Sequence, residues 1–153
     1  EEGGDRASII AFNTGTTRLQ ALTSDRQALV DAVERIEIAS GSRVDMGIHR
    51  AIFELVETPT QRDRYLAMVV LSDGRAHGVD EDSVVAAAED ARDLGIVLFV
   101  VGVGPNMDED VLRDMAGIAD RYAPAPDPES LIAIYEKLSG RVICPPEVYW
   151  PRW

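Results

Sequence analysis

Hydrophobic positions fall into two patterns that alternate along the chain. Residues 66–71 and 96–101 are short, continuously apolar runs, whereas the segments between them place apolar side chains three or four positions apart. The first pattern is typical of strands buried on both faces, and the second of helices with one buried face. The repeated strand–helix order predicts a doubly wound α/β fold, in which a mostly parallel sheet carries helices on both faces.

The beginning of the chain predicts a β-hairpin at one edge of this sheet. Residues 6–13 and 17–22 have strand patterns and are separated by a turn at Gly15. A capping-box pattern, Ser24-Asp25-Arg26-Gln27, then opens a helix. The apolar side chains expected on the buried face of this helix are Leu29, Val33 and Ile36.

The rest of the chain continues the alternation. Helices are expected from Val44, over residues 80–94 and 108–119, and from the Asp127-Pro128 pair; strands are expected over residues 64–72, 96–102 and 122–125. The expected buried stripes are Val44, Ile48, Ile52 and Leu55 in the first of these helices, and Leu131, Ile134, Tyr135 and Leu138 in the last. We therefore expect one domain over residues 1–140, followed by a tail rich in proline and aromatic residues over 141–153.

Composition and charge exclude several classes of protein. Hydrophobic residues make up 46% of the 153, which is enough for a globular core. The net charge of −12 argues against binding to nucleic acid or to anionic membranes. No apolar run approaches the roughly 20 residues of a membrane-spanning helix, so we expect no direct membrane insertion. The lone cysteine, Cys144, cannot form a disulfide within the chain; it is either a small buried hydrophobe or the partner of a cysteine elsewhere.

Two oxygen-bearing residues stand where doubly wound folds place their sites, at the carboxyl ends of strands. Asp73 follows a buried strand and can offer a hard ligand to Mg²⁺ or Ca²⁺, although Asp73-Gly74 can equally be an ordinary turn. Ser42 begins a helix, where its hydroxyl can ligate a metal or cap the helix together with Asp45. The sequence alone does not decide between a metal ligand and a turn residue at Asp73, or between a metal ligand and a helix cap at Ser42.

No catalytic motif supports an enzyme. The chain contains neither a G-x-S-x-G nucleophile turn nor a G-x-x-x-x-G-K-[ST] phosphate loop. Gly102-Val103-Gly104 fails the dinucleotide pattern G-x-G-x-x-G at its third glycine. The two histidines, His49 and His77, have no evident partners. We therefore expect a binding protein and no catalytic residues.

Four segments, taken in order, resemble the von Willebrand factor A (VWA) domain family. They are GDRASIIAF at 4–12, SGSRVDMGI at 40–48, VVLSDG at 69–74 and GIVLFVVGVG at 95–104. The resemblance implies a protein-binding or adhesion module with a metal-ion-dependent adhesion site. Carried over by position, Ser42 and Asp73 would be ligands of the divalent metal, Mg²⁺ or else Ca²⁺ or Mn²⁺.

One family motif, D-x-S-x-S, is absent from this chain, and the family's first strand and first helix are absent with it. That strand is central in the family's sheet, so the resemblance implies a gap between the strand at 8–12 and the strand at 66–71. Open backbone groups there would cost roughly 1–3 kcal/mol each. We expect a separate polypeptide to supply the missing strand and helix. The alternatives are a sequence that begins late within the domain, or a C-terminal tail that fills the gap, which Pro145, Pro146 and Pro151 disfavour.

Two functions therefore compete at this point. The first is a metal-dependent module that binds a protein ligand, in an extracellular or cell-surface setting. The second is a structural subunit that uses the same scaffold for assembly into a larger complex, without a metal. Metal dependence of partner binding distinguishes them.

Overall fold

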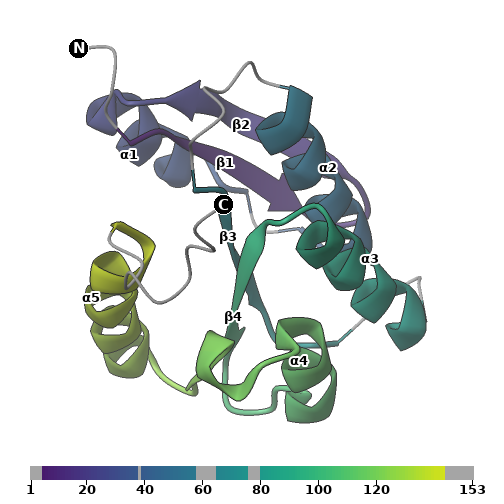
Figure 1. The fold of residues 1–153 in the computed structure, drawn as a ribbon. Helices are drawn as coiled ribbons and strands as arrows, with labels where there is room; N and C mark the ends of the chain where they lie inside the picture. Colours follow the sequence, from purple (N-terminus) through teal and green to yellow (C-terminus); the bar gives the residue numbers. More distant parts are fainter. Residues whose placement is uncertain (1–4, 38, 58–64, 76–79, 144–153) are drawn as a thin grey trace, which may run out of the picture.

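The structure is a computed structural model, which describes residues 5–37, 39–57, 65–75 and 80–143 and the side chains among them up to Leu138 (Figure 1). The predictions for His77, for Cys144 and for most of the C-terminal tail lie outside these residues. Two sheets are present. Strands β1 (Ala7–Phe12) and β2 (Thr16–Thr23) form the predicted antiparallel hairpin. Strands β3 (Ala67–Ser72), β4 (Val97–Val103) and β5 (Tyr122–Ala125) form a parallel sheet in that order.

The parallel sheet follows from the apolar runs seen in the sequence. Strand β4 lies in the middle, and the five residues from Leu98 to Gly102 are buried because helices cover both of its faces. Met68 of β3 aligns with Leu98, and Val100 aligns with Tyr122 of β5. This arrangement confirms the predicted α/β fold with a mostly parallel sheet and a β-hairpin at one edge.

Helices cover the two faces unequally (Figure 1). Helices α2 (Val44–Glu57), α3 (Glu81–Asp93) and α4 (Glu109–Ala116) lie on one face, over the larger apolar core. Helices α1 (Arg26–Glu34) and α5 (Pro128–Ile143) lie on the other, and a short 3-10 turn, Ala119–Arg121, precedes β5. No helix in the described part of the chain is long and apolar enough to cross a membrane.

Helix ends follow the expected capping chemistry with two corrections. Asp80 caps α3 by accepting from the Ser83 amide at 2.8 Å. Helix α1 is capped by Asp25 rather than by Ser24, since its carboxylate accepts from the amides two and three residues later. Helix α2 begins at Val44, so the residue before it is Arg43, and Asp45 binds that guanidinium instead of completing a capping box with Ser42.

The buried faces of two helices also differ from the expected ones. Helix α1 buries Ala32, whereas Val33 and Ile36 are about half exposed, so the predicted inward face is wrong for these two residues. In α5 the predicted stripe packs against β4 except for Tyr135, which is 44% exposed. Both helices therefore carry apolar side chains that the described residues leave uncovered.

The break between the two sheets is the most unusual feature of the fold. β1 pairs with β2 and β3 pairs with β4, and within the described residues no ladder joins β1 to β3. Helix α2 packs on both sides of the break, since Phe12 of β1 joins the same apolar core as Met68 and Val70 of β3. The family resemblance implies an unpaired gap between the strands at 8–12 and 66–71, and the structure has a break between β1 and β3.

Candidate functional site

Ser42 lies in a loop that is fixed to the end of the hairpin. The Arg43 amide donates to the Asn13 carbonyl at 2.8 Å, immediately beyond the end of β1. Gly41 has φ +100°, and a Cβ there would stand 2.6 Å from the Thr14 methyl group. Only glycine fits this close approach without strain, so the loop presents Ser42, which is partly buried, at the carboxyl end of β1.

Asp73 lies in a turn at the carboxyl end of β3. One of its carboxylate oxygens accepts from the Arg75 amide at 3.0 Å, and its carbonyl accepts from the Asp108 amide at 2.7 Å. Gly74 has φ +76°, and a Cβ there would stand 2.5 Å from the Asp108 carbonyl oxygen. The Asp-Gly turn is therefore formed. The other carboxylate oxygen of Asp73 accepts no hydrogen bond from the described residues.

Ser42 and Asp73 belong to different sheets but lie at the same edge of the domain. Helix α2 starts beside the end of β1, and α3 starts after the end of β3. Helices α2 and α3 pack against each other. No hydrogen bond joins Ser42 to Asp73 in the described part of the chain. The break between β1 and β3 therefore separates the two predicted ligands.

An ion pair beside Ser42 was not anticipated from the sequence. Arg43 grips Asp45 with two hydrogen bonds, Nε to Oδ1 at 2.9 Å and Nη2 to Oδ2 at 2.7 Å. This hydrogen bonding to Arg43 is the main reason that the pKa of Asp45 lies below its ordinary value, although partial burial opposes it. With both oxygens engaged, Asp45 fixes the loop of Ser42. The only sequence signal for the pair was two opposite charges two positions apart.

A polar pocket opens beside Asp73. It has a volume of about 350 Å³ and is lined by Arg75 and by the five residues from Asn106 to Asp110. The carboxylates of this segment stand in the first turn of α4, where negative charge is favourable. Asp108 caps α4, because its carboxylate accepts from the Val111 amide at 3.4 Å. The same segment also borders the edge of the sheet at which the parallel strands end. The carboxylates of this segment and the Arg75 cation thus line a pocket next to the Asp73 turn.

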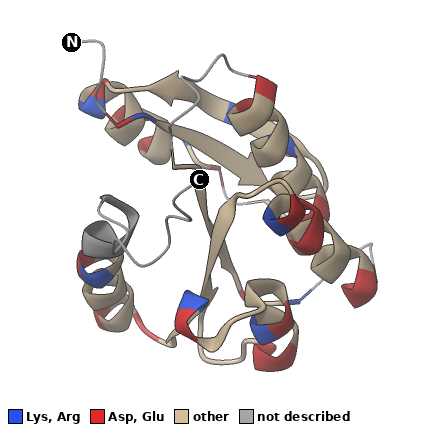
Figure 2. Cartoon of the chain, viewed as in Figure 1, with Lys and Arg blue, Asp and Glu red and all other residues tan. Residues whose placement is uncertain are grey.

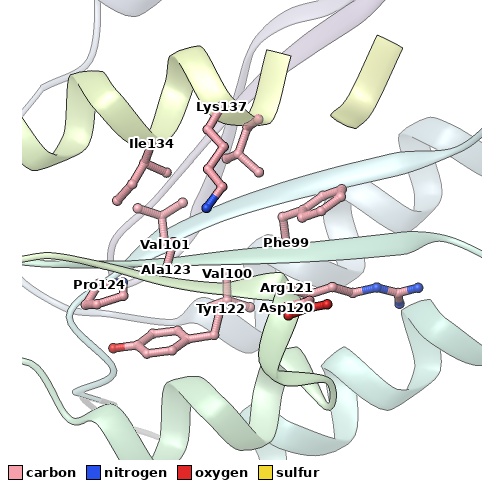
Figure 3. Close-up of a pocket in the computed structure, with 11 residues that line it drawn as sticks. Phe99, Val100, Val101, Asp120, Arg121, Tyr122, Ala123, Pro124, Ile134 and Lys137 are labelled. Atoms are coloured by element: carbon pink, nitrogen blue, oxygen red, sulfur yellow. The ribbon is translucent and has the colours of Figure 1, made fainter. Parts of the chain in front are cut away.

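A second pocket lies on the opposite face of the sheet, between β4, β5 and α5, and has a volume of about 290 Å³ (Figure 3). Its walls are mostly apolar, with Phe99, Val101 and Ile134 among them, and Lys137 extends from α5 toward the strands. None of its lining residues is a serine, cysteine or histidine.

The fit of a divalent metal at the carboxyl edge is partial. Mg²⁺ takes six oxygen ligands in octahedral geometry, of which several can be water. The chain offers one hydroxyl, from Ser42, and one carboxylate, from Asp73, on either side of the break. Within the described residues, no cluster of three His, Cys, Asp or Glu side chains could hold a metal. A hydroxyl and a carboxylate are groups that suit a hard cation, but two such groups are fewer than a cation of this kind needs.

Comparison with known proteins gives a family match over most of the chain. The model of the von Willebrand factor type A domain matches residues 1–137. The chain is 28% identical over 123 residues to an uncharacterized protein, sll0103, of Synechocystis, 41% identical over 76 residues to the collagen alpha-5(VI) chain of Mus musculus, and 38% identical over 76 residues to matrilin-1 of Bos taurus. These matches cover 77%, 50% and 48% of the chain but only 28%, 3% and 13% of the relatives. The chain thus matches only a small part of each relative's length.

Solved structures share the fold at low sequence identity. The conserved hypothetical protein BatB of Bacteroides thetaiotaomicron superposes with a TM-score of 0.72 at 20% identity, over 92% of this chain and 80% of that one. Manganese-loaded TRAP of Plasmodium vivax gives 0.71 at 18%, over 88% and 57%. Proximal thread matrix protein 1 of the mussel byssus, with zinc in its MIDAS motif, gives 0.75 at 17%, over 90% and 35%. These likenesses concern the fold.

Proposed function

Because the chain belongs to the von Willebrand factor type A domain family, we propose that it is an adhesion-type module that binds a protein ligand through a divalent cation. The observation that carries the proposal is the position of Ser42 and Asp73. Both stand at the carboxyl edge, each fixed by a glycine loop of positive φ, and one Asp73 oxygen is free of hydrogen bonds from the described residues. The proposed cation is Mg²⁺, with Ca²⁺ or Mn²⁺ as alternatives, since all three accept hard oxygen ligands.

Each residue of the edge has a role in this proposal. The Ser42 hydroxyl and the Asp73 carboxylate would hold the cation, and Asp45 and Arg43 would keep the Ser42 loop in place. The bound cation would take a carboxylate of the protein ligand into its remaining position. Manganese in TRAP and zinc in the mussel protein support a cation at this edge of the fold.

The remaining ligands would come from a separate polypeptide that also supplies a strand and a helix. The break between β1 and β3 supports this, because it separates Ser42 from Asp73 and leaves the ligand set incomplete. Similarity to a collagen chain and to matrilin-1 favours a place outside the cell or at its surface. Nothing in the chemistry of the two pockets favours catalysis, and we propose no enzymatic activity.

A second candidate function is that of a structural subunit that assembles without a metal. The observation in its favour is the apolar surface that α1 and α5 leave exposed, which suits permanent burial against another polypeptide. In this case Asp73 would serve only as the first residue of its turn.

Titration with Mn²⁺ distinguishes the two functions. In NMR spectra, bound Mn²⁺ broadens nearby amide signals, and we expect the strongest broadening around Ser42 and Asp73. Replacing Asp73→Asn removes the one charged ligand that we propose among the described residues and should weaken Mn²⁺ binding at least about tenfold. The matched control is Asp82→Asn, an exposed carboxylate in the first turn of α3 at the same edge. Equal effects of the two substitutions would show that acidity alone attracts the ion and would favour the structural subunit.

A further inference from the structure

The packing of one methionine beside the Asp73 turn points to a modification site. We propose that the thioether of Met107 is a site of reversible oxidation, and that its sulfoxide loosens the contact that holds Asp73 in place. The inference goes beyond the proposed function, because it concerns the turn itself and holds whether or not a cation binds there.

Met107 combines access to solvent with contact to the core. It is partly buried, packs against the larger apolar core, and lines the polar pocket of about 350 Å³ beside Asp73. Met68 and Met115 are 7% and 0% exposed, so a small oxidant reaches them only when the fold opens. Met46 is 36% exposed, but it belongs to α2 rather than to the loop before α4. A dissolved oxidant therefore reaches Met107 and Met46 first.

The sulfur of Met107 has close neighbours on two sides. The Tyr122 hydroxyl donates to it at 3.4 Å, and a Cβ added to Gly102 would stand 2.7 Å from it. A thioether suits this place because it is apolar and only a weak hydrogen-bond acceptor. A sulfoxide oxygen cannot fit between the sulfur and the hydroxyl, because an O–H···O hydrogen bond alone spans about 2.7 Å.

Oxidation adds one oxygen atom to this sulfur. When hydrogen peroxide is the oxidant, its O–O bond breaks, an S–O bond forms, the sulfur loses two electrons and the peroxide leaves as water. The product is polar and chiral, and methionine sulfoxide reductases return it to the thioether. In that reverse step two thiols become a disulfide and the oxygen leaves as water. The oxidised side chain of Met107 has to move away from Tyr122 or from Gly102.

Asp108, the next residue in the chain, connects Met107 to the Asp73 turn. Its amide donates to the Asp73 carbonyl at 2.7 Å, and its carbonyl oxygen would stand 2.5 Å from a Cβ added to Gly74. The turn and the loop before α4 are therefore packed without spare room. Because Asp108 cannot keep its place when its neighbour is displaced, oxidation of Met107 weakens the hydrogen bond from the Asp108 amide to Asp73.

The first measurement is the order in which the methionines are oxidised. The 153-residue chain is exposed to dilute hydrogen peroxide with EDTA present, and its peptides are followed by mass spectrometry. We expect Met107 to be oxidised at least about tenfold faster than Met68 and Met115, which react only through opening of the fold. Oxidation of Met107 that is no faster than that of Met115 would overturn the inference.

The second measurement is amide hydrogen exchange at Asp108, made in the variant Met46→Leu so that peroxide reaches Met107 first. Oxidation should accelerate exchange at Asp108 at least about tenfold, and exchange at Val100 in the middle of β4 by less than about twofold. Methionine sulfoxide reductase with a thiol should restore the slow exchange. The inference fails if exchange at Asp108 stays unchanged, rises equally at Val100, or is not restored by the reductase.

Two further substitutions test the cause. Met107→Leu conserves size and has no sulfur, so peroxide should leave exchange at Asp108 within about twofold. Tyr122→Phe keeps the ring but removes the hydroxyl, which leaves room for the sulfoxide oxygen, and the acceleration by peroxide should fall at least about threefold. Acceleration as large as in the unchanged protein, in either variant, would overturn the inference. Because EDTA removes the cation, failure of cation binding does not affect these results.

Discussion

Strand β1 of the hairpin and strand β4 of the parallel sheet are both mostly apolar in sequence but reach different degrees of burial. In β4, Leu98, Val100 and Val101 are fully buried, because α3 and α4 cover one face and α5 the other. In the hairpin, no residue of β1 or β2 is fully buried. Apolar sequence is therefore not sufficient for a finished core. A strand becomes fully buried only when it has neighbours on both edges and cover on both faces.

Helix α2 compensates for part of this difference by holding the hairpin. Its Gly47 packs so closely on the Phe12 ring that a Cβ would stand 2.8 Å from a ring carbon. Near its other end, Glu54 is 3% exposed and accepts from the Arg18 guanidinium at 2.8 Å and from the Leu22 amide at 3.1 Å. The hairpin is thus held by α2 and also packs on α1, whereas the parallel sheet has its own core.

The largest effect is expected in the parallel sheet. Replacing Leu98→Ala leaves a cavity in the middle of β4 and should lower the free energy of unfolding by about 2–5 kcal/mol, as large-to-small core substitutions do. Ile10→Ala in β1 should cost less than half as much, because Ile10 is only partly buried. Urea denaturation monitored by circular dichroism measures both. Equal losses would contradict the contrast between the two regions.

The next effect concerns the attachment of the hairpin. Glu54→Ala leaves the Leu22 amide and the Arg18 guanidinium without this acceptor and should cost about 1.5–3 kcal/mol, the range for hydrogen bonds to charged groups. Hydrogen exchange should accelerate in β1 and β2 before it does in β4. The control is Glu57→Ala, an exposed carboxylate one turn later on the same helix. Uniform acceleration across both sheets would show that α2 does not act locally.

Acidification should loosen the same attachments. The pKa of Glu54 is lowered because hydrogen bonds from Arg18 and Leu22 outweigh its desolvation, and that of Asp45 is lowered mainly by Arg43. A lowered pKa in the folded state stabilises the protein above the ordinary values of 4.5 and 3.8, and this stabilisation is lost as the pH falls below them. The urea midpoint should therefore decrease between about pH 6 and about pH 3. In the variant with Glu54→Gln and Asp45→Asn, the urea midpoint should depend less on pH. If the midpoint falls with pH as steeply as in the unchanged protein, these two residues are not the cause of the pH dependence.

The smallest effect is expected at an exposed ion pair of the parallel region. Arg113 and Glu109 lie one turn apart on α4 and approach to 2.7 Å, with about half of each side chain exposed. Glu109→Ala should change the free energy of unfolding by no more than about 0.5 kcal/mol. Thermal unfolding at low and high salt measures it. A larger loss in the free energy of unfolding would mean that this surface ion pair stabilises α4 more than the packing of its buried side chains does.

Much of the fold could be predicted from the sequence, because strands buried on both faces have continuous apolar runs that leave little choice of structure. The bounds of β5 are those expected, and the break between the sheets lies at the predicted place. The buried face of α1 could not be predicted, since apolar spacing shows that Val33 and Ile36 need cover but not that the described chain provides it.

The site was predictable only in part for a similar physical reason. Position at a strand end identifies Asp73 and Ser42 as candidates, since the carboxyl ends of parallel strands share one edge. The Arg43–Asp45 pair and the approach of Asp108 to Asp73 depend on loop geometry, which local sequence patterns do not encode. The role of Ser42 and Asp73 as metal ligands stays a prediction until cation binding is measured.

The attachment of the hairpin by α2 has a consequence for the order of folding. The unit from β3 to β5 has an apolar core that does not need the hairpin, although its strands pair over long loops such as the one from Met68 to Leu98, and the hairpin consists of neighbours in sequence. Each can therefore form without the other. Contacts such as Glu54 with Arg18, 36 residues apart, close a longer loop. We expect docking of the hairpin on α2 to follow formation of the parallel unit, and pulse-labelling hydrogen exchange that finds β1 protected before β4 would contradict this sequence of events.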